Sequence, residues 1–309
     1  MSRYLLQRIL QAVPVLLIVI CVTFLLIHAA PGGPFDEEKA VPADILKQLN
    51  ARYKLDQPLP VQLADYLVRA VQGDLGPSFK FPGRSVNEII AAGFPVTLEL
   101  GLLALTFALL LGVGSGIIAV LRPNSWSDYL PMSLAMLGIC LPSYVLGPLL
   151  VLLFGIHLEW LPVAGWGYIP GDKILPVVTL GLAYAAYIAR LSRGGLLEIM
   201  SADFIRTARA KGLGEGMIIL RHALRGGLLP VVSFMGPAMA GLIGGSFVVE
   251  TIFQIPGLGR YYVQAAFNRD YTLILGMTLF FSVLIVVFNL LADVVTAWLD
   301  PRIRRGGID

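Results

Sequence analysis

Long apolar segments separated by short polar stretches dominate this chain. A helix that spans a membrane needs about 20 mainly apolar residues. Six segments have this character: residues 9–30, 95–121, 130–156, 174–193, 228–249 and 273–298. The pattern predicts an all-α polytopic membrane protein with six transmembrane helices. The first segment is expected to be an uncleaved span, because its apolar core is longer than that of a signal peptide.

The polar segment 31–94 follows the first span and predicts a small helical insertion. Apolar residues recur with helical spacing in residues 42–54 and 58–71. The run from Ser85 to Glu88 matches the capping box that begins a helix. A segment this short has little core of its own. We therefore expect it to pack on the membrane helices or on a partner.

Composition supports the membrane assignment. Only 14% of the residues are charged, against roughly 25% in soluble proteins. The net charge of +3 is modest, and no nucleic-acid partner is expected. Cys21 and Cys140 fall inside apolar segments, where we expect buried thiols rather than a disulfide. The three histidines are scattered without metal-ligand spacing, so no metal site is predicted.

The positions of lysine and arginine predict the orientation of the chain. Cytoplasmic loops carry an excess of both residues. With the N-terminus inside, the cytoplasmic cations are Arg3, Arg8, Arg122, Arg190, Arg193, Arg206, Arg209, Lys211, Arg221, Arg225, Arg302, Arg304 and Arg305. The short outer loops hold only Lys173, Arg260 and Arg269. Both termini are therefore expected in the cytoplasm, and segment 31–94 outside it.

Several features inside the spans need a role. Glu99 and Asp293 lie near the ends of predicted spans, where we expect a structural pair or snorkelling. Pro142 and Pro148 are expected to kink the third span. Glycines allow another helix to approach closely. They cluster at Gly112, Gly114 and Gly116, and again at Gly241, Gly244 and Gly245.

The loop from Asp203 to Arg225 is unusually ordered for a membrane-protein loop. Asp203 is expected to cap a helix start, and Arg209 and Lys211 suit that helix's end. Gly212 offers the left-handed residue that ends helices, and Gly214 begins a second helix that reaches about Arg225. Two short helices joined by a glycine elbow indicate a docking element. A solvated basic loop is the alternative.

Motifs for catalysis are missing from the sequence. It contains no HExxH and no GxSxG, so no catalytic residue is predicted and an enzyme is not expected. It also lacks GxxxxGK[ST], the phosphate-binding loop for ATP. If the chain takes part in active transport, the energy comes from another subunit.

The residues of the loop resemble the EAA-type coupling motif of ABC importer permeases. The match is to the form RTARAKGL of the dipeptide/oligopeptide/nickel permease family, at Arg206, Thr207, Ala208 and Gly212. Other similar segments are LNARYKLDQPLPVQ (49–62), QGDLGPSF (72–79), WLPVAGWG (160–167), VVETIFQIPGLGR (248–260), NRDY (268–271) and DPRIR (300–304). Residues 31–35 and 76–90 are most similar to the B-type subunit of an oligopeptide permease. Gly214 and Gly226-Gly227 depart from relatives, which often carry Ser and Asn there.

The resemblance implies a type I ABC importer permease fold in a bacterial inner (cytoplasmic) membrane. It implies a homologous C-type permease subunit, two cytoplasmic ATPase subunits that bind ATP and Mg, an extracytoplasmic peptide-binding protein and surrounding lipid. No cofactor is expected on this chain. The residues it assigns to ATPase coupling are Asp203, Arg206, Thr207, Ala208, Arg209, Ala210, Lys211, Gly212, Leu213 and Glu215.

The predicted organisation is a first span at 1–30, the insertion at 31–94, a five-helix core at 95–298 with a coupling loop at 194–227, and a tail at 299–309. Candidate residues of the substrate path are Pro142, Tyr144, Tyr184 and Tyr187, with core packing as the alternative. Dipeptides, glutathione or nickel complexes remain alternative substrates. A secondary transporter that works without ATP is the alternative from another class.

Overall fold

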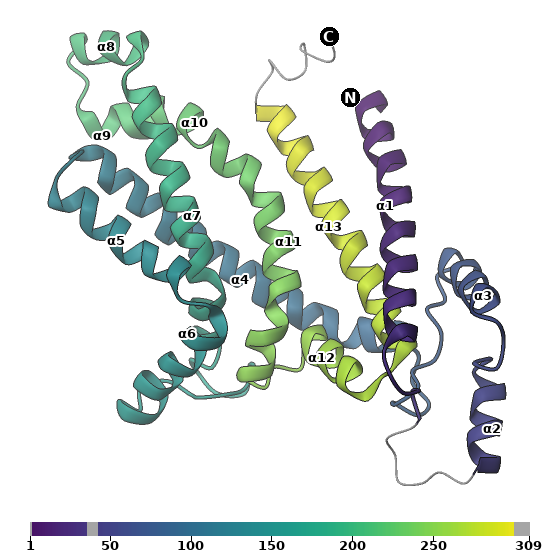
Figure 1. Ribbon diagram of the computed structural model, residues 1–309. Coiled ribbons are helices and arrows are strands. Elements are labelled where there is room, and N and C mark those ends of the chain that lie inside the picture. Colours follow the sequence, from purple (N-terminus) through teal and green to yellow (C-terminus); the bar gives the residue numbers. More distant parts are fainter. Residues whose placement is uncertain (1, 36–42, 300–309) are drawn as a thin grey trace. The chain divides into compact units, whose positions relative to one another are not determined.

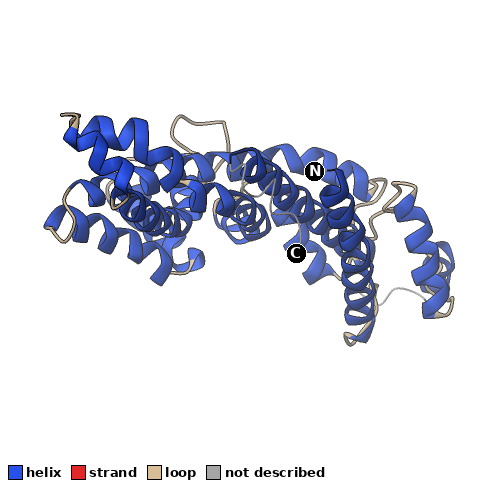
Figure 2. Cartoon of the chain, turned by 90° about the horizontal axis from the view of Figure 1, so that it is seen from above, coloured by secondary structure: helices blue, strands red, loops and turns tan. Residues whose placement is uncertain are grey.

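The computed structural model describes residues 2–35 and 43–299, which form helices and loops without a β-strand (Figure 2). The helices are α1 (Ser2–Ala29), α2 (Ala43–Arg52), α3 (Leu59–Val71), α4 (Val86–Leu121), α5 (Trp126–Cys140), α6 (Ser143–Leu150), α7 (Ile174–Met200), α8 (Asp203–Ala210), α9 (Glu215–Ile218), α10 (Leu224–Gly227), α11 (Leu229–Ile252), α12 (Leu258–Asn268) and α13 (Tyr271–Leu299). Two π-helical turns, η1 (Val151–His157) and η2 (Ile219–Ala223), complete them. The predicted tail beyond residue 299 lies outside the described residues.

The described residues include five helices that are long and apolar enough to cross a membrane. They are Leu10–Ala29, Val86–Leu121, Ile174–Met200, Leu229–Ile252 and Tyr271–Thr296. A sixth span is present if the pair Trp126–Cys140 and Ser143–His157 counts as one broken helix. Five of the six expected spans are therefore confirmed in their order, and the broken pair occupies the place of the third.

The third predicted span breaks at Pro142. Its two halves meet at 109°, and Pro142 stands outside helical geometry with φ −58° and ψ 145°. Proline lacks an N–H and pushes the preceding residue out of the α region. Pro148 lies inside α6 without ending it, and η1 begins at Val151. The expected kink is thus concentrated at Pro142.

The chain divides into two compact units. One unit contains residues 2–96 and 256–284, and the other contains residues 97–255 and 285–309 as far as they are described. The predicted boundaries at 30, 94 and 298 follow chain order. The contacts instead group the insertion with α1, α12 and the first half of α13.

In the unit of residues 2–96 and 256–284, the insertion packs on membrane helices. Tyr66 of α3 lies in a core with Ile20 and Phe24 of α1 and Leu275 of α13. The capping box is confirmed. The backbone N–H of Glu88 donates to Ser85 Oγ at 3.2 Å, and the N–H of Ser85 donates to Glu88 Oε2 at 3.0 Å.

One buried carboxylate ties the insertion to the start of α13. Asp270 is fully buried and accepts from the N–H groups of Phe79 (3.1 Å) and Lys80 (3.2 Å) and from the Ser78 hydroxyl. It also accepts the Leu273 N–H at 3.2 Å, so it caps α13. One side chain therefore fixes two segments that are far apart in sequence.

In the other unit, α7 packs against α5 and α11 (Figure 1). Glycine allows the close approach of α4. A Cβ at Gly112 would lie 2.7 Å from the Ala185 carbonyl oxygen, and one at Gly116 would lie 2.5 Å from Ser192 Cβ. Gly114 has nothing within 4 Å. Two of the three glycines, Gly112 and Gly116, therefore allow the close packing of α4 on α7.

Candidate functional site

The predicted docking element is present as α8 and α9. Helix α8 begins at Asp203, with Ala202 as its N-cap residue and no side-chain cap. The expectation that Asp203 caps the helix is therefore wrong. Asp203 is the first helical residue instead, where its charge is favourable beside the positive end of the helix dipole. Its carboxylate lies 3.4 Å from the Arg206 guanidinium.

The end of α8 forms the predicted glycine elbow. Gly212 has φ +81°, a region that only glycine adopts without strain. The Gly212 N–H donates to the Arg209 carbonyl at 2.9 Å, and the Leu213 N–H donates to the Ala208 carbonyl at 3.3 Å. These two bonds form a Schellman motif, which satisfies carbonyls left free at a helix end.

A bidentate ion pair bridges the elbow. Arg209 Nε lies 2.6 Å from Glu215 Oε1, and its second nitrogen lies 3.1 Å from Oε2. The hydrogen bond from Arg209 lowers the pKa of the Glu215 carboxyl, and the same bond raises the pKa of Arg209. Both side chains are about half exposed, so the pair sets geometry more than it adds stability.

Helix α9 begins after Gly214, as predicted, and continues through η2 and α10 to Gly227. Ile205 and Ala208 of α8 are buried against Ile218 of α9. Farther along, Ala223 packs with Val120 of α4 and Leu196 of α7. The two loop helices are therefore one packed body that rests on two membrane helices.

Most of the predicted coupling residues lie on the exposed side of this body. Asp203, Arg206, Thr207, Arg209, Ala210, Lys211, Gly212, Leu213 and Glu215 are exposed, and Ala208 is buried. Phe204 and Met217 are also about half exposed, and neither was among the predicted coupling residues. Exposed apolar side chains in a polar loop are a sign of a contact surface. Their position next to the predicted coupling residues was the signal in the sequence that could have identified them.

An ion pair joins α5 to α7 in the same unit. Arg193 Nε lies 2.6 Å from Asp128 Oδ1, and its second nitrogen lies 2.7 Å from Oδ2. The Asp128 side chain is 2% exposed. The Asn124 N–H also donates to Asp128 at 3.0 Å. Arg193 was predicted for its charge, whereas its partner Asp128 was not.

The acids near the other ends of the spans have different partners. Glu99 forms an ion pair with Lys173 at 2.5 Å and accepts from Trp166 Nε1 at 3.0 Å. Of the two expected roles, Glu99 therefore has that of a structural pair. Glu250 was missed because it follows the predicted end of the fifth span. It is fully buried and accepts from the hydroxyls of Thr97 (2.8 Å) and Ser246 (2.7 Å). Asp293 is half-buried.

The candidate path residues occupy different environments. Pro142 is the N-cap residue before α6, and Tyr144 is 63% exposed. Tyr187 is 45% exposed, with its ring 6.0 Å from that of Phe234. Tyr184 packs in the core between α4, α7 and α11. Their role in a substrate path stays a prediction.

Comparison with known proteins adds independent evidence. Residues 108–305 match the family described as "Binding-protein-dependent transport system inner membrane component". Residues 1–101 match the corresponding N-terminal family. Together, the two matches cover nearly all of the chain.

Curated relatives match over their full length. The oligopeptide transport system permease protein OppB of Haemophilus influenzae is 47% identical, over 98% of this chain and 100% of the relative. The dipeptide transport system permease protein DppB of Bacillus subtilis is 42% identical, over 98% of both. The glutathione transport system permease protein GsiC of Salmonella typhimurium is 41% identical, over 98% of this chain and 99% of the relative.

A solved structure shares the fold. A chain of the MetNI methionine ABC transporter, in an inward-facing conformation, superimposes with a TM-score of 0.58. The match covers 69% of this chain and 96% of that chain, at 18% sequence identity. At this identity, the likeness shows a common fold.

Proposed function

Because this chain belongs to the family of binding-protein-dependent transport system inner membrane components, we propose that it is the membrane-spanning subunit of an ATP-driven importer of oligopeptides. The predicted importer-permease fold is confirmed. The choice of oligopeptides rests on relatives such as OppB, which is 47% identical over its full length. Dipeptides and glutathione are the next candidates, since relatives named for them are 42% and 41% identical.

The observation that carries the proposal is the packed body formed by α8, η2, α9 and α10. Its outer side exposes Phe204, Thr207 and Lys211, which are spaced so that they share one face of a helix. Its inner side packs on α4 and α7 through Ala223 and its neighbours. A partner that moves the outer side therefore also moves the ends of two spans.

In this proposal two cytoplasmic ATPase subunits, which bind ATP and Mg, contact the exposed face of α8. A homologous C-type permease completes the path, and an extracytoplasmic protein delivers peptide. Both termini lie in the cytoplasm. ATP binding brings the ATPases together, the loop helices move with them, and the spans open toward the outside. Hydrolysis resets the transporter.

The test is purification in mild detergent of the tagged chain expressed with its native neighbours, followed by reconstitution in liposomes. We expect a second permease and ATPase subunits to co-purify, and uptake of labelled oligopeptide to require both ATP and the binding protein. Uptake by this chain alone, without ATP, would instead support a secondary transporter. Competition among dipeptides, tetrapeptides and glutathione identifies the substrate class.

A further inference from the structure

A small cavity with a mixed polar and apolar lining lies where the insertion meets two membrane helices, within the unit of residues 2–96 and 256–284. Its volume is about 50 Å³, and its walls include His28 of α1, Tyr66 and Arg69 of α3, and Thr272 of α13. A water molecule needs roughly 10–15 Å³ of such space. The cavity therefore has room for roughly three waters.

Three buried polar atoms at this cavity have no hydrogen-bond partner among the described residues. They are His28 Nε2, the Tyr66 hydroxyl and Arg69 Nε. Tyr66 is only 4% exposed. A buried polar group without a partner costs about 1–3 kcal/mol, and folded proteins leave few of them. Three such atoms around one cavity indicate that a bound molecule, here called the guest, supplies the missing hydrogen bonds.

The chemistry of these atoms limits the guest. His28 Nδ1 lies 2.8 Å from the Phe24 carbonyl oxygen. A carbonyl only accepts, so Nδ1 carries a hydrogen, and Nε2 is an acceptor when the ring carries no second hydrogen. Arg69 Nε can only donate. Burial raises the pKa of the Tyr66 phenol, which keeps its hydroxyl protonated. The guest must therefore both donate and accept hydrogen bonds.

We propose that this cavity binds ordered water, which hydrogen-bonds His28, Tyr66 and Arg69 and so joins the insertion to the first membrane span. An anion that carries no hydrogen cannot donate to an accepting Nε2, and a metal cation is disfavoured by the permanent charge of Arg69. A water molecule can do both, and buried waters in proteins make about three hydrogen bonds.

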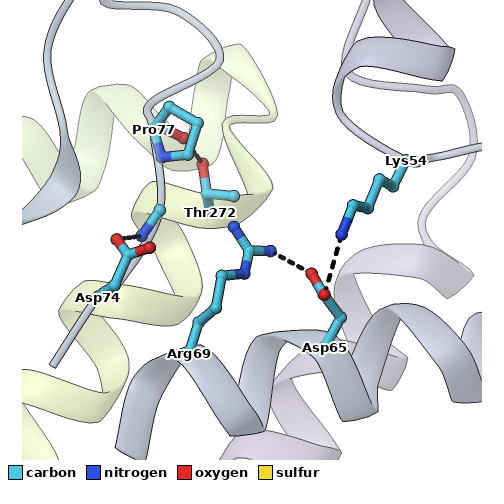
Figure 3. A network of polar contacts seen from close by, with 7 residues as sticks. Lys54, Asp65, Arg69, Asp74, Pro77 and Thr272 are labelled. Carbon is cyan, nitrogen blue, oxygen red and sulfur yellow. Dashed lines mark hydrogen bonds and ion pairs between the residues drawn. The ribbon is translucent and has the colours of Figure 1, made fainter. Parts of the chain in front are cut away.

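Neighbouring ion pairs fix the position of Arg69. Its guanidinium lies 2.8 Å from Asp65, which also accepts from Lys54 at 3.0 Å. Figure 3 shows this chain of contacts along α3, with Arg69 also facing Thr272. Thr272 is already paired, since it donates to the Pro77 carbonyl at 2.6 Å. The bound water thus completes a joint in which the other polar groups bond directly.

The test measures hydrogen exchange of α3 in the complete transporter, held in lipid nanodiscs. The direction in which the exchange rate changes when the Tyr66 hydroxyl is removed distinguishes a hydroxyl that is hydrogen-bonded to water from one that has no partner. If water satisfies it, Tyr66→Phe should speed exchange about tenfold, which corresponds to about 1.4 kcal/mol. Unchanged or slower exchange would overturn the proposal, because removal of an unsatisfied buried hydroxyl is neutral or stabilising.

A double-mutant cycle tests the bridge itself. His28→Phe keeps a ring beside Phe24 and removes the acceptor. If one water network joins the two residues, the double variant should exchange little faster than either single variant. Strictly additive effects would contradict it. Tyr262→Phe is the matched control, because the Tyr262 hydroxyl bonds Thr278 directly at 3.2 Å.

A cryo-electron microscopy map that resolves waters gives an independent result, even if a variant fails to assemble. A peak within hydrogen-bond distance of both His28 Nε2 and the Tyr66 hydroxyl supports the proposal. A direct Tyr66–His28 bond, with no peak in the cavity, would overturn it.

Discussion

Replacing Gly212 with valine tests how the coupling loop works. Gly212 has φ +81°, and a Cβ added there would meet nothing within 4 Å. The added Cβ therefore has open space, and backbone strain is the main effect that we expect. The Schellman bonds from Gly212 and Leu213 depend on this conformation.

The size of the strain follows from the backbone angle. The left-handed conformation costs an ordinary L-residue roughly 1–2 kcal/mol, and a β-branched side chain tolerates it least. Since about 1.4 kcal/mol is a tenfold change in an equilibrium, the equilibrium constant that favours the elbow over other loop conformations should fall roughly tenfold. Gly212→Asn should be mildest, Gly212→Ala intermediate and Gly212→Val most severe, because Asn adopts this conformation more readily.

The assay compares ATP-driven peptide uptake and binding-protein-stimulated ATP hydrolysis at equal membrane levels of the chain. We expect Gly212→Val to keep its membrane level but to uncouple hydrolysis from uptake. Gly214→Val is the matched control, since Gly214 has φ −69° and also has open space around its Cβ. Normal uptake by Gly212→Val, or an equal defect in Gly214→Val, would show that the left-handed conformation of residue 212 is not needed for coupling.

Three further predictions concern other contacts. Asp270→Ala should cost at least about 1–3 kcal/mol, because it leaves several buried donors without an acceptor, and faster protease cleavage within residues 72–85 of the insertion measures the loss. Gly116→Val should destabilise by about 1–3 kcal/mol through overpacking, since its Cβ would lie 2.5 Å from Ser192 Cβ; Gly114→Val has open space and should leave the thermal midpoint unchanged. The hydrogen bond from Lys54 is the largest cause that lowers the pKa of Asp65. The stability that this ionised carboxylate contributes is therefore present above the unfolded pKa of about 3.9 and is lost as pH falls through the lower folded pKa. Protease resistance of α3 should show this pH dependence, and Asp65→Asn should abolish it.

Local features of this chain could be predicted from its sequence. The capping box of Ser85 and Glu88 forms its hydrogen bonds within four residues. The elbow at Gly212 is equally local, because the need for glycine comes from one backbone angle. Apolar periodicity also located α2 and α3 within a few residues. These features could be predicted because the residues that cause them are adjacent in the sequence.

Long-range polar contacts could not be predicted. Asp270 lies 192 residues from Ser78 in the chain, and Asp128 lies 65 residues from Arg193. Nothing in the neighbourhood of either acid specifies its partner, because the pairing depends on how the helices pack. Glu250 was missed for a different reason. Its hydrogen bonds with Thr97 and Ser246 allow burial of a carboxylate that hydropathy places outside a span.

The most direct test of the central claim is a cross-link between α8 and the ATPase. With Cys21 and Cys140 replaced, a cysteine at Thr207 carries a short photo-reactive group in the assembled complex. Trp160 carries the same group as a control, since it is 69% exposed and follows a span on the predicted outer side. We expect the group at Thr207 to cross-link an ATPase subunit in an ATP-sensitive manner, and the group at Trp160 not to do so. An assembled, active transporter in which Thr207 never cross-links the ATPase would contradict it.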